Sequence, residues 1–135
     1  MSLLTLWLLV AIGGAFGALL RFWLTRLSAW RWGSSIPATL SVNILGSLIL
    51  GVGWVIVSYY QHMPCGPEDS GLPAYAMIEL GFVGGFTTFS AFAVELRGML
   101  PNHWLRALAY MLGSVLGSVM GLILGYILGG FVVYG

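Results

Sequence analysis

The chain has 135 residues, of which 59% are hydrophobic and 7% are charged, and its formal net charge is +1. A soluble domain carries about 25% charged residues, so this composition indicates an integral membrane protein and gives no reason to expect a nucleic-acid partner. The one cysteine, Cys65, excludes an intrachain disulfide. The sequence offers no cluster typical of a metal site, a Ser/His/Asp triad or a phosphate loop, so we do not expect an enzyme.

A spanning helix needs about 20 mainly apolar residues, and the first such run predicts a helix over about residues 3–27. Gly13 and Gly17 form a GxxxG pair, which is typical of close helix packing. Arg21 lies inside the run, and an intramembrane charge indicates function. Three roles stay open for this arginine: it attracts anions into a vestibule, it snorkels to the membrane surface, or it forms an ion pair with Glu95 of the third predicted helix.

The second helix is expected over about residues 37–60. Thr39 and Asn43 are four residues apart, so they share one face of this helix. An amide in hydrocarbon is costly unless it is hydrogen-bonded. Asn43 therefore either bonds to a neighbouring helix or offers its NH₂ donors to an anion. The following polar loop, residues 61–73, separates no domains, and we assign it no role.

The third helix is expected over about residues 74–100, and it contains the stretch GFVGGFTTFSAF at 81–92. The pair Gly84 and Gly85 is a poor helix interior, at about 1 kcal/mol per glycine, and hydroxyl residues follow at once. We therefore predict a helix that breaks near the middle of the membrane and exposes main-chain groups, as transporters do at ion sites. The alternative is a packing face of small residues. Phe89 and Phe92 share a face after the break, either as apolar core or with their positive ring edges toward a small anion.

The fourth helix is expected over about residues 104–133. Five glycines recur there at four-residue spacing, at positions 113, 117, 121, 125 and 129, and predict a close approach of another helix. Tyr110, Ser114 and Ser118 form a neighbouring row of hydroxyl groups, which serves either packing or an anion path. A lining rich in donors, with no acid in the first two helices, favours an anion over a cation.

The motif GGFTTFSAF at 84–92 resembles the signature of the Fluc (CrcB) family of fluoride channels. The similarity extends to GGxxGxxxR at 13–21, to the asparagine and glycine at 43 and 46, and to the tyrosine–serine–serine row. It covers all four predicted helices. One departure is Ala91, where the family usually has a hydroxyl residue, and another is the long acidic loop at 61–73.

This resemblance implies an antiparallel, dual-topology homodimer with two narrow pores, which exports fluoride passively across the inner membrane of a microbial cell. It also implies a structural sodium ion at the dimer interface, held by the main-chain carbonyls of Gly84 and Thr87. The pore residues that it implies are Asn43, Phe89, Phe92, Thr39, Tyr110, Ser114 and Ser118. The first-helix arginine and third-helix acid of the family correspond to Arg21 and Glu95.

The sequence thus predicts a fluoride-selective channel in a single transmembrane domain, residues 1–135. One rival is a small four-helix multidrug carrier, which is expected to need a membrane-embedded acid that the first helix lacks. Another is a scaffold subunit that transports nothing. Orientation also leaves an alternative open, because Arg26, Arg31 and Arg106 fall on one side of the membrane. The positive-inside rule places that side in the cytoplasm, so a paired relative of opposite orientation could replace the second copy.

Overall fold

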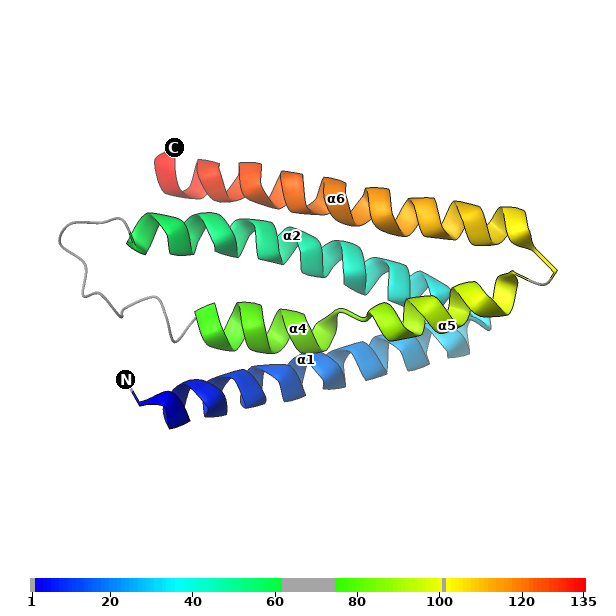
Figure 1. Cartoon of the computed structure of the whole chain (residues 1–135), viewed down its shortest axis with the longest axis horizontal. Helices are drawn as coiled ribbons and strands as arrows, with labels where there is room; N and C mark the ends of the chain where they lie inside the picture. The colour runs from blue at the N-terminus through cyan, green and yellow to red at the C-terminus, as the bar shows by residue number, and fades with distance from the viewer. Residues whose placement is uncertain (1, 62–74, 101) are drawn as a thin grey trace.

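The computed structural model describes residues 2–61, 75–100 and 102–135, and within them the chain is all-helical (Figure 1). The elements are α1 (Leu3–Trp32), α2 (Ile36–Gln61), η1 (Ala76–Val83), α4 (Gly84–Phe86), α5 (Phe89–Met99) and α6 (Trp104–Tyr134). Four stretches of this described part are long and apolar enough to span a membrane: α1, α2, α6 and Met77–Met99 of the third span. The prediction of a four-span membrane protein is therefore confirmed, and Cys65 lies outside the described residues.

The first helix is longer than expected, because it runs to Trp32 and not to about residue 27. It ends at Gly33, whose φ of 67° is left-handed and whose N–H donates to Ala29 O at 2.9 Å. Glycine adopts this conformation without the steric cost that other residues meet. The arginine and tryptophan residues near the end of the run therefore belong to the last turns of α1.

Helices α2 and α6 pack together through the glycines of the fourth span (Figure 1). A Cβ at Gly121 would lie 2.8 Å from Ile44 O, and one at Gly125 would overlap Leu48 O. On the other side of the contact, a Cβ at Gly51 would overlap Leu122 O. From Gly121 to Gly129 the two backbones are therefore too close for any side chain between them, as the glycine spacing predicted. The close approach does not extend to the start of the row, because a Cβ at Gly117 would meet only the Ile44 side chain and one at Gly113 would meet nothing within 4 Å.

Helix α1 packs in the same way against η1 and α4. A Cβ at Gly13 would overlap Met77 O, and one at Gly17 would overlap Phe82 O. The contact is reciprocal at Gly85 of α4, because a Cβ there would overlap Gly14 O. The predicted GxxxG packing face is thus confirmed, and its partner is the first half of the third span.

The helical conformation of the third span stops after Phe86. Thr87 has φ −75° and ψ 158°, and Thr88 has φ −153° and ψ 119°, so both are extended. Helix α5 then begins at Phe89, with the Thr88 side chain accepting a hydrogen bond from Ala91 N. The glycine pair itself remains helical. Gly85 serves the contact with α1, whereas a Cβ at Gly84 would meet nothing within 4 Å, and the two threonines supply the extended segment.

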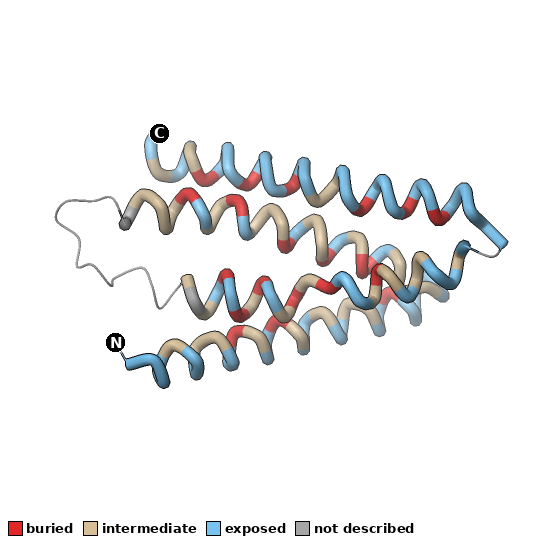
Figure 2. Tube along the Cα trace, viewed as in Figure 1, coloured by how far each residue is buried: buried red, intermediate tan, exposed pale blue. Residues whose placement is uncertain are grey.

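Buried residues lie along the surfaces where the helices meet, while the outward faces of α1 and α6 are exposed in the single chain (Figure 2). These exposed faces carry large apolar side chains such as Trp7, Phe16 and Leu116. Such surfaces fit contact with lipid or with another membrane chain. The chain termini lie at one end of the bundle, beside the end of α2 (Figure 1).

Candidate functional site

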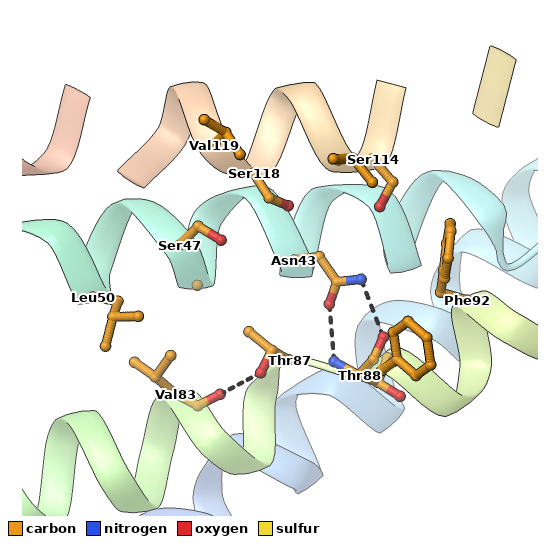
Figure 3. A pocket seen from close by; sticks show the side chains of 13 residues that line it. Asn43, Ser47, Leu50, Val83, Thr87, Thr88, Phe92, Ser114, Ser118 and Val119 are labelled. Carbon is orange, nitrogen blue, oxygen red and sulfur yellow. Dashed lines mark hydrogen bonds between the residues drawn. The ribbon is translucent and has the colours of Figure 1, made fainter. Parts of the chain in front are cut away.

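A pocket of about 470 Å³ lies beside the extended segment, between α2, α6 and the third span (Figure 3). Five of the predicted pore residues line it together: Asn43, Phe89, Phe92, Ser114 and Ser118. Thr87 and Thr88 also contribute to the lining. Residues far apart in the sequence therefore meet at one cavity, and that cavity is next to the point where helical structure stops.

Asn43 is bound to the extended segment by two hydrogen bonds, which Figure 3 shows as a pair. Its Nδ2 donates to Thr88 O at 3.1 Å, and its Oδ1 accepts from Thr88 N at 2.9 Å. The side chain thus replaces the helical partners that Thr88 lacks. An asparagine amide has two N–H donors, so one remains for another acceptor in the pocket. The two roles left open for Asn43 are therefore compatible.

The last carbonyls of the third span before the extended segment, those of Val83, Gly84 and Gly85, have unequal surroundings. Val83 O accepts from both the N–H and the hydroxyl of Thr87, each at 2.9 Å. Gly85 O accepts from Arg21 Nε at 3.2 Å. Thr88 N would bond to Gly84 O in a continuous helix, but it donates to Asn43, and the described residues place no hydrogen bond on Gly84 O.

Helix α5 begins at the pocket, so the free N–H groups of its first turn lie beside the cavity. The N-terminus of a helix attracts anions through these N–H groups and through the helix dipole. Phe89, at this terminus, is 80% exposed in the single chain, whereas Phe92 is buried. The two rings are 5.8 Å apart between centroids, which confirms that they share a face.

The Glu95 carboxylate accepts hydrogen bonds from three hydroxyl groups, one on α2, one on α6 and one in the turn before α2. Tyr110 donates to its Oε2 at 2.6 Å, Thr39 donates to its Oε1 at 2.9 Å, and Ser35 also donates to Oε1. Thr39 is fully buried and Tyr110 is nearly so. The Tyr110 ring also packs against Phe92, with centroids 5.2 Å apart. The two predicted pore residues that do not line the pocket, Thr39 and Tyr110, therefore form a network with Glu95 next to Phe92 of its lining.

The expected alternative of an ion pair between Arg21 and Glu95 is wrong for the single chain. Arg21 bonds to the main chain of α4, and Glu95 bonds to hydroxyl groups. The reason is rotation: α5 follows an extended segment, which turns Glu95 toward α2 and α6 and away from α1. The other two alternatives for Arg21, attraction of anions and snorkelling, stay open.

Sequence reasoning missed Thr88 and Ser35. Ser35 lies four residues before Thr39, so helical spacing could have placed it on the same face as the threonine. Thr88 carries its role in the main chain, which bonds to Asn43, and its side chain caps α5. No side-chain pattern reports a main-chain partner, so this role had no signal in the sequence.

Comparison with known proteins gives a consistent result. A family model described as CrcB-like protein, Camphor Resistance (CrcB), matches residues 8–126. A protein of Saccharophagus degradans named fluoride-specific ion channel FluC is 39% identical over 116 residues, which cover 83% of this chain and 80% of the relative. A protein of the same name from Alteromonas mediterranea is 38% identical over 114 residues, covering 83% and 84%. Another from Chloroflexus aurantiacus is 36% identical over 110 residues, covering 80% and 82%.

Proposed function

The chain belongs to the CrcB family, and on that basis we propose that it is a fluoride-selective ion channel. It is a multi-pass membrane protein that lets fluoride leave the cytoplasm passively through the inner membrane, and it catalyses no reaction. The observation that carries the proposal is the pocket, where a helix N-terminus, the Asn43 amide, two serines and two phenylalanines meet.

Fluoride is small and strongly hydrated, so a dry path must replace the hydrogen bonds that the ion leaves behind. The pocket offers the second N–H of Asn43 and the hydroxyls of Ser114 and Ser118. The rings of Phe89 and Phe92 add the positive edges of their aromatic systems. The network of Glu95 stands behind this lining and engages the O–H donors of Thr39 and Tyr110, which holds both side chains beside the path.

The working unit is an antiparallel homodimer with two pores. Support comes from Phe89, whose ring is 80% exposed although it belongs to the pore, and from the apolar outer faces of the helices. Labelling of Cys65 tests the topology in intact cells. An impermeant thiol reagent should modify about half of the copies, whereas modification of nearly all copies would instead indicate fixed insertion and an oppositely oriented relative.

A structural sodium ion belongs at the dimer interface, held by the carbonyls of Gly84 and Thr87. Oxygen dipoles of the main chain suit a hard cation. The fit is supported by Gly84, because its carbonyl has lost its helical partner to Asn43 and its residue is exposed in the single chain. The C-terminal end of α4 also carries partial negative charge. Sodium would contribute rigidity here and takes no part in moving fluoride.

Ion efflux from liposomes tests the proposed function. Purified protein is reconstituted, and release of fluoride and of chloride is followed from vesicles loaded with both ions. We expect rapid fluoride release and chloride retention, because the larger halide does not fit between ring edges and short donors. Equal release of both halides would refute selectivity, and release of neither would favour a scaffold.

A further inference from the structure

One acidic side chain is buried in the third span and has no part in the site described above. Glu79 of η1 is 5% exposed, and its Oε2 is buried without a hydrogen-bond partner. Its carboxyl group occupies the space above Gly53 of α2, where a Cβ would overlap Oε1. The missing side chain of Gly53 therefore makes the room in which this carboxyl group lies.

Glu79 lies in the first turn of η1, two residues after the start of the Met77–Met99 span. Its neighbour Met77 contacts Gly13, which is about ten residues into α1 and hence about 15 Å from the start of that helix. Irregular helical geometry marks the same place, since η1 has the wide turns of a π-helix. Such turns are frequent at functional sites.

No cation of the described chain faces the carboxyl group. The backbone atoms of α1 that lie closest to the glycines and carbonyls of η1 belong to Val10, Gly13, Gly14 and Gly17, and α4 has no titratable residue. The arginines of α1 lie farther along, and Arg21 is engaged with Gly85 O. On α2 the described titratable side chain is Tyr59, whose ring packs against Tyr134. An ionised carboxylate without a partner is very costly in such surroundings, so the group holds a proton.

The Glu79 carboxyl group lies just beyond one end of the candidate pocket. Leu50 and Val83 face one another at the end of the pocket that is farthest from Phe92 (Figure 3). Gly53 follows Leu50 by three residues and Glu79 precedes Val83 by four, so each lies about one turn farther along its helix. The contact between Gly53 and Glu79 therefore closes the space between α2 and the third span directly beyond this end of the pocket.

We propose that Glu79 is a proton-binding site at the end of the anion pathway, and that fluoride passes while this carboxyl group is neutral. The proposal rests on the proposed fluoride conduction. Loss of the proton to water at the nearby helix ends would leave a negative charge about 15 Å from an anion at Asn43, because ten residues of α2 separate Gly53 from Asn43. At an effective dielectric constant of about 20, such a charge lowers anion occupancy roughly sixfold.

Infrared spectroscopy tests the proton site without any need for ion flux. The full-length protein in lipid at neutral pH should show the carbonyl stretch of a protonated carboxylic acid. That band should be missing in Glu79→Gln and should weaken as the pH rises. Gly53→Ala gives a second variant, because its methyl group displaces the carboxyl group and should shift the band. A spectrum of the unchanged protein without this band would overturn the proposal.

Fluoride efflux then tests the link to the pathway, with leakage of protein-free vesicles subtracted at each pH. The unchanged protein should slow about sixfold as the pH is raised through the range in which the band disappears. Glu79→Gln should keep its rate, because it has the same shape and no charge to develop. Equal pH dependence of the two proteins would overturn the proposal. Absence of fluoride release at every pH would instead refute the proposed channel function, while the band would still report the proton.

Discussion

The two halves of the third span are held in place by different means. The first half, η1 with α4, packs on α1 with its backbone against the backbone of Gly13 and Gly17. The second half, α5, is held by side chains: Glu95 bonds to hydroxyls of other elements, and Phe92 packs on Tyr110. The extended residues between them bond to Asn43.

The two halves therefore have different roles: packing on α1 for the first half, and lining of the pocket for the second. Contacts between backbones leave no room for variation, so the face of the first half that meets α1 acts as a fixed support. The second half presents its N-terminus, an exposed phenylalanine and donor groups to the pocket. At the interruption, the end of α4 favours a cation and the start of α5 favours an anion. Variants of each half should therefore fail in different ways.

The largest effect is expected in the support. In Gly17→Ala, the methyl group overlaps Phe82 O, and the backbone has to move. We expect a loss of more than about 3 kcal/mol of stability, with little folded protein recovered. Gly14→Ala is the matched control on the same helix, because a Cβ there lies 3.7 Å from Gly81 O, an ordinary contact. Thermal unfolding in detergent measures both, and equal stability of the two variants would contradict the packing.

The next effect is expected at the connection between the halves. Asn43→Ala leaves the N–H and C=O of Thr88 without partners, which should lower stability by about 1–3 kcal/mol and abolish most fluoride flux. Asn43→Asp keeps an acceptor for Thr88 N but places a potential negative charge on the path. We expect it to lose flux as well, with a smaller loss of stability. Normal fluoride efflux in either variant would show that Asn43 is not a pore residue.

A change confined to function is expected at Phe89. Phe89→Ile keeps an apolar side chain but removes the positive ring edge, and the ring is 80% exposed in the chain. We expect most fluoride flux to disappear while the dimer still assembles and melts at nearly the same temperature. Phe92→Ile is the paired comparison: it should also stop conduction, but it should lower stability as well, because Phe92 packs on Tyr110. Fluoride efflux and thermal unfolding are measured for both variants. Normal conduction would show that these phenylalanines belong to the apolar core and not to the pore.

The smallest effect is expected behind the pocket. Tyr110→Phe removes one of the three donors to Glu95 and leaves Thr39 and Ser35 in place. We expect about 1 kcal/mol less stability and a fluoride rate that falls several-fold without being lost. Complete loss of flux with unchanged stability would show that the Tyr110 hydroxyl meets the ion directly.

Glycine spacing and apolar runs were sufficient to predict the spans and their packing faces, because both depend on residue type and helical period alone. The pair at 13 and 17 met backbones as expected, and so did positions 121 to 129 of the predicted ridge, whereas positions 113 and 117 did not. Two other features depend on what happens after the interruption. The helix stops at the threonines and not at the glycine pair, and the rotation of α5 decides that Glu95 meets Thr39 and Tyr110 while Arg21 meets Gly85 O. The spacing of residues along the sequence gives no information about that rotation of α5.

The central claim is that the interruption at Thr87 and Thr88 divides the third span into a cation-binding end and an anion-binding end. An experimental structure of the protein in lipid, with sodium and fluoride present, tests it most directly. We predict density for a cation at the carbonyls of Gly84 and Thr87, and density for an anion beside Phe89 and Asn43. A helix that continues through both threonines, with neither ion bound, would contradict the account.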